Sequence, residues 1–452
     1  MRPDLSDRHS ADVLSADVSP ASSHVVNLGC RLNAAEADIM RGHLRDAARD
    51  GAAPTVVVNT CAVTNAAVAD SRRAVRRARR EHPHARIVVT GCAAQIDPAM
   101  FAALPEADQV VGNAEKLDPA TFAPATFADP APARIRVGDI RTAEARPFFT
   151  GSSNAAQRHQ ERTRAFLQVQ NGCDHACTFC IIPQGRGRAR SVPAGETVQH
   201  VRNLAAQGHR EVVLTGVDLS SWGGDLPGRP GLGGLVRRIL RLVPELARLR
   251  LSSLDPAEVD DTLIETLRED PRLSPYLHLS LQAGDDMVLK RMKRRHSRAD
   301  VLALAARLRA ARPDIALGAD VIAGFPTETE AMHRNTLELI ESLPVPWLHV
   351  FPYSPRAGTP AARMPAIAGP TVKRRARELR AAGARARAAH LARRVGQTDT
   401  ALFESGDSEE PGWGRLSDFS RVRVSTPPPA GTLSSVRLTG QDGRTLLGEI
   451  CG

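Results

Sequence analysis

The sequence predicts a mixed α/β protein, with an open parallel α/β domain at the N-terminus, a partial (βα)6 barrel in the centre and a small β-barrel at the C-terminus. Over the first two parts, short apolar runs alternate with helix-length segments, the order typical of parallel sheets. The last part has short β-permitting runs separated by Gly, Pro, Asp and Ser. With 452 residues, 42% of them hydrophobic, the chain can form three domains of about 150 residues each. We expect a disordered tail over residues 1–22 and domains over residues 23–145, 155–390 and 391–452.

Three strand-and-helix units are expected in the N-terminal domain, and each strand ends at a cysteine. Cys30, Cys61 and Cys92 (the wide triplet) are evenly spaced, 31 residues apart, about the length of one such unit. Ligand crevices in open parallel sheets lie beyond the carboxyl ends of the strands, so three thiolates would meet at one sheet edge. The alternative is three buried structural thiols, because free cysteine is among the most buried residue types. The apolar runs are residues 24–29, 55–60 and 86–91, and the first helix is expected over residues 33–48.

A second set of cysteines, Cys173, Cys177 and Cys180 (the tight triplet), lies in one loop directly after the strand-like residues 166–170. A cubane cluster ordinarily takes four thiolates, one per iron, and this loop offers three. One iron is then open to a small chelating ligand, a role suited to the amino and carboxylate groups of S-adenosylmethionine (SAM). Zinc is the competing interpretation, with His175 completing a Cys3His set. The CxxxCxxC spacing resembles the radical SAM superfamily, and the two triplets together indicate two iron–sulfur clusters.

Downstream of the tight triplet, strand-like runs and helix-length segments continue to alternate, as in a parallel barrel. Six such units make a partial (βα) barrel, and catalytic groups in barrels of this type gather at the carboxyl ends of the strands. The expected strands are residues 166–170, 211–215, 249–253, 277–282, 316–323 and 347–353.

Polar residues and glycines at these strand ends are candidates for binding the nucleoside and methionine portions of SAM. Gly216 and Asp218 follow the second strand, Ser253 the third, Gln282 the fourth and Gly324 the fifth. Gly216 and Gly324 could instead be ordinary turn glycines.

The pattern changes after a charged, helix-like stretch over residues 373–394. The β-permitting runs that follow include residues 421–424 and 434–438, within about 60 residues of this kind. A small β-barrel is expected here, a shape that often binds nucleic acid.

The net charge of +10 indicates an anionic partner. Arginine and lysine cluster in residues 72–80, 290–295 and 373–394, where they would bind phosphates in a salt-dependent way. The alternative to phosphate binding is that the many arginines reflect a GC-rich genome and that those on helices form solvated faces. Three clusters together with a terminal β-barrel favour RNA.

Neither a secretion signal nor an apolar run long enough for a membrane span is visible in the sequence. We therefore expect a cytoplasmic protein without membrane contact, with reduced thiols rather than disulfides. Cys451 has no partner spacing and is expected to be a free surface thiol.

Six motifs and the C-terminal segment resemble the methylthiotransferase family of radical SAM enzymes. The resemblance covers about residues 24–450, and its C-terminal part is similar to that family's TRAM domain, a small RNA-binding barrel. The motifs are residues 28–33, 59–64, 90–95, 172–183, 278–284 and 351–359.

The resemblance implies replacement of a carbon-bound hydrogen by a methylthio group, with two [4Fe–4S] clusters and SAM as cofactors. An aromatic C–H bond is too inert for acid–base chemistry, so the tight-triplet cluster would reduce SAM to release a 5′-deoxyadenosyl radical. The wide-triplet cluster would present or supply sulfur, and a second SAM would supply the methyl group. A reductant protein such as flavodoxin or ferredoxin and a sulfur donor are implied partners.

Substrates within this family divide between adenosines in tRNA and an aspartate of a ribosomal protein. Residues 29–33 and 214–219 are most similar to the branch acting on N6-threonylcarbamoyladenosine at tRNA position 37, next to the anticodon. The alternatives are N6-isopentenyladenosine and the ribosomal aspartate. Bases of the anticodon loop can be splayed and read singly, and reaching C2 requires extracting the base from its stack. An RNA-binding iron–sulfur sensor without chemistry would leave the three-thiolate cluster unexplained.

This sequence departs from the family wording at a few positions. At residues 185–191 the family motif would have an aromatic residue followed by Ala-Arg-Gly, which this sequence lacks. Ala94 and Ala283 are smaller than the residues expected at those positions. These changes leave the cysteines intact and bear on substrate contacts.

Overall fold

The computed structural model describes residues 23–123, 133–142, 163–404 and 412–451, and the expected tail over residues 1–22 lies outside them. The chain divides into two compact units by its contacts. Unit 1 comprises Met1–His159, Asn171–Arg190 and Ser354–Thr359, and unit 2 comprises Gln160–Gln170, Ser191–Tyr353 and Pro360–Gly452. In the described part of the chain, no helix has both the length and the apolar character needed to cross a bilayer.

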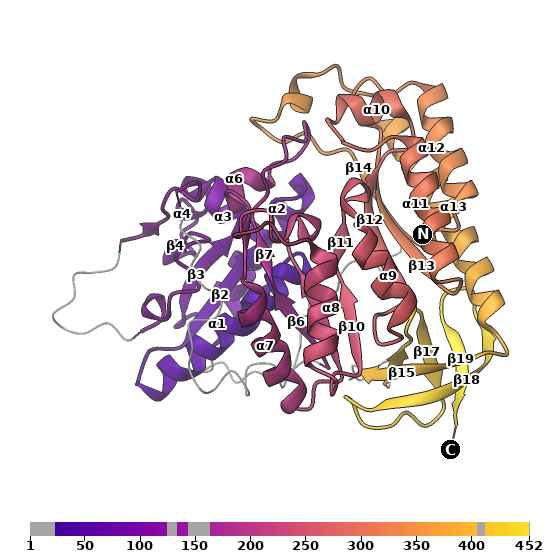
Figure 1. Cartoon of the computed structure of the whole chain (residues 1–452). Coiled ribbons are helices and arrows are strands. Elements are labelled where there is room, and N and C mark those ends of the chain that lie inside the picture. Colours follow the sequence, from indigo (N-terminus) through magenta and orange to yellow (C-terminus); the bar gives the residue numbers. More distant parts are fainter. Residues whose placement is uncertain (1–22, 124–132, 143–162, 405–411, 452) are drawn as a thin grey trace. The chain divides into compact units, whose positions relative to one another are not determined.

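Unit 1 contains a five-stranded, all-parallel sheet, drawn in indigo and violet in Figure 1. Its central strands are runs of valine and isoleucine, residues that favour a sheet buried on both faces. The strands lie in the order β1 (His24–Asn27), β2 (Thr55–Thr60), β3 (Arg86–Gly91), β4 (Gln109–Val111) and β5 (Ile135–Arg136).

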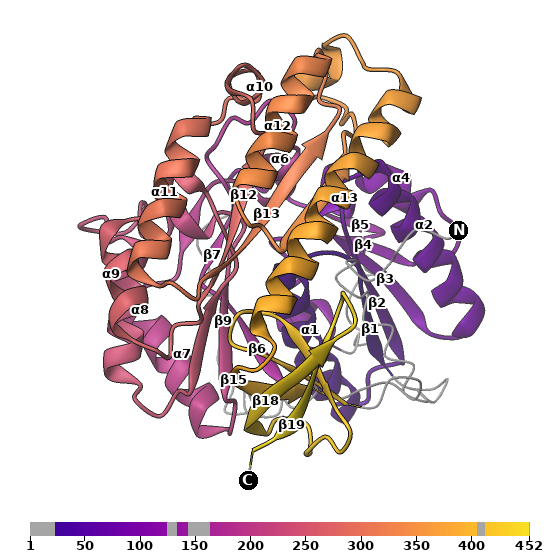
Figure 2. The ribbon, with the colours of Figure 1, turned by 90° about the vertical axis from the view of Figure 1, so that its right-hand side faces the viewer.

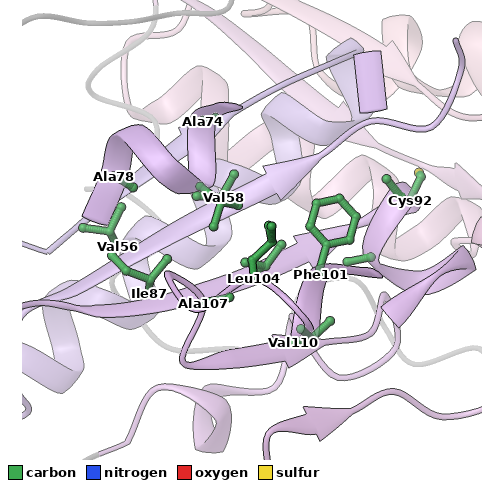
Figure 3. Packing of buried hydrophobic residues seen from close by; sticks show 14 of the residues in the cluster. Val56, Val58, Ala74, Ala78, Ile87, Cys92, Phe101, Leu104, Ala107 and Val110 are labelled. Carbon is green, nitrogen blue, oxygen red and sulfur yellow. The ribbon is translucent and has the colours of Figure 1, made fainter. Parts of the chain in front are cut away.

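Helices cover both faces of this sheet because successive strand residues point to opposite sides. Val57 packs with Met40 and Leu44 of α1 (Arg31–Arg49). Its neighbours Val56 and Val58 instead pack with residues of α2 (Asn65–Glu81), α3 (Cys92–Ile96) and α4 (Pro98–Ala102). Figure 3 shows Cys92 beside Phe101, at the end of this second cluster away from Val56 and Ala78.

Unit 2 contains the expected parallel βα array. The predicted second and fifth strands are confirmed to the residue, and the predicted third strand is broken at Ser252, whose amide donates to the carbonyl of Leu214. The break divides the array into sheets of three and four strands. The strands are β6 (Arg164–Gln168), β9 (Glu211–Thr215), β10 (Arg248–Leu251), β11 (Ser253–Leu254), β12 (Tyr276–Gln282), β13 (Ala316–Ala323) and β14 (Trp347–Pro352).

Helices alternate with these strands, as the sequence predicts, and Figure 2 shows several of them beside β12 and β13. The charged stretch predicted as a helix over residues 373–394 forms the longer α13. The helices are α7 (Ala194–Ala206), α8 (Leu232–Leu242), α9 (Asp261–Glu269), α10 (Asp286–Arg291), α11 (Arg298–Ala311), α12 (Glu330–Ser342) and α13 (Gly369–Arg394).

The C-terminal part of unit 2 is a closed five-stranded barrel, as predicted, and it is drawn in yellow tones in Figure 2. Buried leucines, valines and Phe403 fill its interior, together with Leu391 of α13. The barrel closes in the order β15 (Thr398–Glu404), β16 (Trp413–Arg415), β17 (Arg421–Val424), β19 (Leu446–Ile450) and β18 (Leu433–Gln441).

Two buried arginines join this barrel to the βα array. Arg250 and Arg248 both pair with Glu211, at 2.8 Å and 3.2 Å. Their remaining N–H groups donate to backbone carbonyls of the C-terminal barrel, including that of Thr400 at 2.7 Å and that of Leu416 at 3.2 Å. Burial by itself would raise the pKa of Glu211, but the two guanidinium groups outweigh it and hold that pKa at about 2.

Candidate functional site

The wide triplet lies at the carboxyl ends of three neighbouring strands of unit 1. Cys30 immediately precedes α1, Cys61 follows β2, and Cys92 is the first residue of α3 after β3. A Cβ placed on Gly29 would lie only 3.1 Å from the Cβ of Cys61, so the Cys30 loop passes directly against that cysteine. The three thiols therefore converge at one edge of the sheet, as the sequence predicts.

The surroundings of these thiols differ from those of ordinary structural cysteines. Cys30 is exposed and Cys61 half-buried, while Cys92 is buried. Desolvation, with smaller contributions from the nearby thiols of Cys92 and Cys30, raises the pKa of Cys61 to about 12. A metal ligand has to be deprotonated, so a thiolate at Cys61 would need a positive charge, such as that of a metal centre, to offset this cost.

The spacing of the sulfurs bears on which metal fits. In a tetrahedral zinc site, Zn–S bonds of about 2.3 Å place the sulfur atoms about 3.8 Å apart. Within the described ranges, neither cysteine triplet has its three sulfur atoms all within 4.8 Å of one another, and the set of the tight triplet with His175 does not gather that closely either. An iron–sulfur cluster, in which each thiolate binds a different iron, does not require its ligand sulfurs to lie that close together.

A buried charged network surrounds the wide triplet. The guanidinium of Arg186 donates from Nε to the Cys92 sulfur at 3.0 Å, and its Nη atoms donate to both carboxylate oxygens of Glu36 and to Oδ1 of Asn33. Lys116 donates to the same Glu36 carboxylate. Although burial would raise the pKa of Glu36, Arg186 and Lys116 lower it below its usual range. The carboxylate therefore stays ionised between two cations.

Asparagines tie this network to the strand ends. The Asn33 amide donates to the carbonyls of Leu28 and Thr60, and its Oδ1 lies 3.9 Å from the Cys30 sulfur. The Asn59 amide donates to the Asn33 carbonyl at 3.0 Å. Asn33 and Asn59 belong to the sequence motifs that carry the family resemblance, whereas the roles of Arg186, Glu36 and Lys116 were missed.

The tight triplet lies in residues 171–190, which belong to unit 1. The amide of Cys173 donates to the Gly187 carbonyl at 3.1 Å, and that of Cys180 to the Cys177 carbonyl at 3.1 Å. The loop continues into α6 (Ile182–Arg186), whose Gly185 carbonyl accepts from the Asn113 amide side chain. The loop that carries these cysteines is thus anchored on the N-terminal sheet domain.

Three of the residues that differ from the family motifs, Gly185, Ala94 and Ala283, are packed against neighbouring parts of the fold. A Cβ on Gly185 would lie 3.3 Å from the Cβ of Cys92, so only a small residue fits there. Ala94 belongs to the hydrophobic core of unit 1, and Ala283 is fully buried in unit 2.

A motif near the end of the βα array also returns to unit 1. The Ser354 hydroxyl accepts from the amide of Asn65, the first residue of α2, at 3.0 Å. Arg356 donates to the Asn65 side chain, and Asn65 donates to the Pro355 carbonyl. These contacts hold residues 354–356 against the start of α2.

In unit 2, the candidate residues after the second strand lie against Gln170. A Cβ on Gly216 would lie 2.8 Å from the side-chain oxygen of Gln170, so this glycine allows close packing. The same oxygen accepts from the amide of Asp218 at 2.8 Å. The Asp218 carboxylate in turn accepts from the Ser221 hydroxyl at 2.6 Å, which fixes its orientation.

The other candidates lie at the ends of later strands. Ser253 begins β11 and pairs with His278 of β12. Gln282 ends β12 with a left-handed backbone, φ 69°, a conformation that costs a residue with a Cβ about 1–2 kcal/mol. Gly324 has φ 73° after β13, and its amide donates to Glu328 at 3.2 Å, so the turn itself requires this glycine.

A polar chain inside the βα array was missed by sequence reasoning. The Tyr276 hydroxyl lies 2.8 Å from Nδ1 of His278, whose Nε2 lies 3.0 Å from Oδ1 of Asp320. Nδ1 of His349 lies 3.2 Å from the same oxygen. The four residues come from three adjacent strands, and only the strand register, not any local spacing, brings them together.

Comparison with known proteins places these observations in a family. A family model described as the radical SAM superfamily matches residues 167–340, and one described as uncharacterized protein family UPF0004 matches residues 22–112. Threonylcarbamoyladenosine tRNA methylthiotransferase MtaB of Rickettsia prowazekii is 46% identical over 383 residues, covering 85% of this chain and 88% of that protein. The chain belongs to the radical SAM methylthiotransferase family. Membership implies SAM and a [4Fe–4S] cluster as cofactors.

Other members of the methylthiotransferase family match over more of the chain at lower identity. The tRNA-2-methylthio-N(6)-dimethylallyladenosine synthase of Erythrobacter litoralis is 34% identical and covers 96% of this chain and 98% of its own. Among solved structures, the radical SAM methyltransferase TsrM of Kitasatospora setae, with cobalamin and a [4Fe–4S] cluster bound, has a TM-score of 0.50 at 16% identity. It covers 72% of this chain and 73% of its own, a likeness of fold alone.

Proposed function

We propose that this methylthiotransferase converts N6-threonylcarbamoyladenosine at position 37 of tRNA, next to the anticodon, to its 2-methylthio derivative. The observation that carries the substrate is the 46% identity to the threonylcarbamoyladenosine enzyme of Rickettsia prowazekii, against 34% for the dimethylallyladenosine synthase of Erythrobacter litoralis. Relatives with the first name from Aquifex aeolicus and Bacillus subtilis are each 35% identical, close to the value for the dimethylallyladenosine enzyme, so the choice of substrate depends on the Rickettsia prowazekii relative.

Six cysteines would hold two [4Fe–4S] clusters, each with one iron left for a reactant. When bound, the clusters and SAM supply the radical, the sulfur and the methyl group that replace the C2 hydrogen of adenine. The wide triplet is supported as a ligand set by the convergence of its thiols and by the cationic Arg186 beside Cys92. The tight triplet is supported by its spacing and by the radical SAM match that begins at residue 167.

Residues at the strand ends of unit 2 would bind SAM. The Asp218 carboxylate is held by Ser221 and is suited to accept from ribose hydroxyls or an ammonium group. Gly216 and Gly324 would bind through their backbone groups, since the chain itself fills the space where their Cβ atoms would lie, and Ser253 and Gln282 would offer a hydroxyl and an amide.

The proposed division into domains follows the same roles. Residues 23–145 would carry the wide-triplet cluster, residues 155–390 the radical SAM chemistry and residues 391–452 a TRAM-like RNA-binding barrel. The tRNA anticodon loop, a flavodoxin or ferredoxin and a sulfur donor are the proposed partners, and the cytoplasm is the proposed location.

Mass spectrometry of tRNA nucleosides from a deletion strain tests the substrate. We expect 2-methylthio-N6-threonylcarbamoyladenosine to disappear and to return on complementation with the wild-type chain. If that nucleoside persists and the methylthiolated isopentenyladenosine is lost instead, the dimethylallyladenosine activity is the correct one. Loss of neither nucleoside would contradict both tRNA substrates and leave the ribosomal aspartate.

Two cysteine variants test the division of labour between the triplets. Cys177→Ala should abolish 5′-deoxyadenosine formation in anaerobic incubation with SAM and dithionite, while iron counting still finds a second cluster. Cys61→Ala should keep SAM cleavage but lose thiolation. An unchanged yield of methylthiolated product from Cys61→Ala would refute the sulfur-delivery role of the wide triplet.

A further inference from the structure

Arg186 is an unusual side chain for the place it occupies. Its guanidinium is only 1% exposed, yet it lies in the short helix that follows the tight triplet and donates to the sulfur of Cys92 in the wide triplet. Two residues fix its orientation, because Glu36 and Asn33 bind the Nη atoms and leave Nε aimed at that sulfur. The contact between the arginine and the thiol is therefore set by the geometry of the network.

A positively charged N–H donor on a ligand sulfur has a definite effect on an iron–sulfur cluster. It withdraws electron density from the thiolate and stabilises the form that carries one more electron, so the reduction potential rises. Hydrogen bonds from charged donors are also shorter and about twice as strong as neutral ones. The other buried cation, Lys116, donates to the same Glu36 oxygen as one Nη of Arg186, and it has no hydrogen bond to a cysteine among those of the described residues.

The ion pair with Glu36 alone does not account for this placement. Lys116 already pairs with Glu36. A second cation on the same carboxylate adds the cost of desolvating another charge, unless its remaining donors find an acceptor of their own. The acceptor that Nε finds is the Cys92 sulfur.

We propose that Arg186 is a positioning residue that orients the Cys92 sulfur and raises the reduction potential of the cluster held by the wide triplet. The inference rests on the proposed function in one respect, the presence of that second cluster. Because Arg186 follows the tight triplet by six residues, one loop then carries ligands of one cluster and sets the electronic state of the other.

A redox titration of the wide-triplet cluster, monitored by electron paramagnetic resonance, tests the proposal. The full-length chain with Cys173→Ala, Cys177→Ala and Cys180→Ala isolates the wide-triplet cluster, and the further changes are made in that background. Arg186→Met with Glu36→Gln removes one positive and one negative charge. We expect its potential to become more negative by about a tenfold change in the reduction equilibrium, about 59 mV for a one-electron couple.

Lys116→Met with Glu36→Gln is the matched control, because it removes the same two charges from the same network and keeps Arg186 on Cys92. Its potential should stay close to that of the unsubstituted network. Arg186→Lys, which keeps the charge without the Nε donor, should shift in the same direction as Arg186→Met. Equal shifts in the two double variants, or no shift in either Arg186 variant, would overturn the proposal.

Iron counts separate the remaining outcomes. If the triple cysteine variant with an intact network holds no iron, the proposed second cluster fails, and the role of Arg186 falls with it. If that protein holds a cluster and only the Arg186 variants fold without iron, Arg186 is needed for assembly, and the claim that it tunes a complete site is wrong.

Discussion

In unit 1 the carboxylate of Glu36 is shared by Arg186 and Lys116, whereas in unit 2 the carboxylate of Glu211 is shared by Arg248 and Arg250. Both networks bury two cations around one anion. They differ in what the remaining N–H groups reach. In unit 2 these groups end on backbone carbonyls of the C-terminal barrel, and in unit 1 they end on a cysteine sulfur and asparagine side chains.

This difference shows that burial of charge does not by itself mark a functional site. Every folded chain has backbone carbonyls that accept hydrogen bonds. Arginines that donate to them therefore hold two parts of a fold together. A thiol at a strand end is an acceptor with chemistry of its own. The acceptors, more than the charges, separate a structural network from one that tunes a site.

The largest expected effect is on the joint in unit 2. Glu211→Gln leaves two buried arginines without their carboxylate, and arginine cannot release its proton, so unfolding free energy should fall by about 5 kcal/mol. All three tryptophans, Trp222, Trp347 and Trp413, lie in unit 2 and report its urea unfolding by fluorescence. Iron content should stay at the wild-type value, and a loss below about 1 kcal/mol would contradict this account.

A smaller loss of unfolding free energy is expected for Glu36→Gln, the matching change in unit 1. Glu36→Gln also strands two cations, but burial already lowers the pKa of Lys116, and this lysine can become neutral. We expect a cost of about 3 kcal/mol, measured by circular dichroism because unit 1 has no tryptophan. Adding Arg186→Met should recover more of this loss than adding Lys116→Met, and the reverse order would refute the reasoning.

Acid should remove the contribution of Glu211. Its pKa in the folded chain is about 2, below the ordinary 4.5, so its stabilisation is complete above pH 4.5 and is lost as pH falls toward 2. A shift of this size corresponds to about 3 kcal/mol. The difference in unfolding free energy between wild-type apoprotein and Glu211→Gln should shrink by that amount between pH 5 and pH 2, and a constant difference would count against it.

The smallest effect is expected at an exposed pair with the same chemistry. Arg385 and Glu341 pair on the surface of unit 2, where their side chains are 65% and 55% exposed. Because water and salt screen such a pair, Arg385→Ala should change unfolding free energy by less than about 0.5 kcal/mol. A loss of unfolding free energy as large as that of Glu211→Gln would show that burial does not account for the contribution of the Glu36 and Glu211 networks to stability.

The strands and the wide triplet could be predicted from the sequence because their signals are local. Runs such as residues 55–60 and 211–215 are continuous and apolar, and an even cysteine spacing follows from repeated strand-and-helix units. The break at Ser252 had no such signal. There the chain changes its pairing partner, because β10 pairs with β9 and β11 pairs with β12.

The buried network could not be predicted because its members are far apart in the chain. Arg186 is 150 residues from Glu36, and Lys116 lies between them in sequence. Residues 185–191 were expected to bear on substrate contacts, whereas Gly185 and Arg186 pack against Cys92. An arginine in a Gly-rich loop carries no pattern that separates a solvated side chain from a buried one.

The left-handed backbone at Gln282 has a practical consequence for anyone who engineers this enzyme. A search for stabilising substitutions would choose glycine at this position and gain about 1 kcal/mol from relief of the Cβ clash. That exchange would also delete an amide group from the strand end where SAM is proposed to bind. Position 282 is therefore one to leave untouched in any effort to make the protein more heat-resistant.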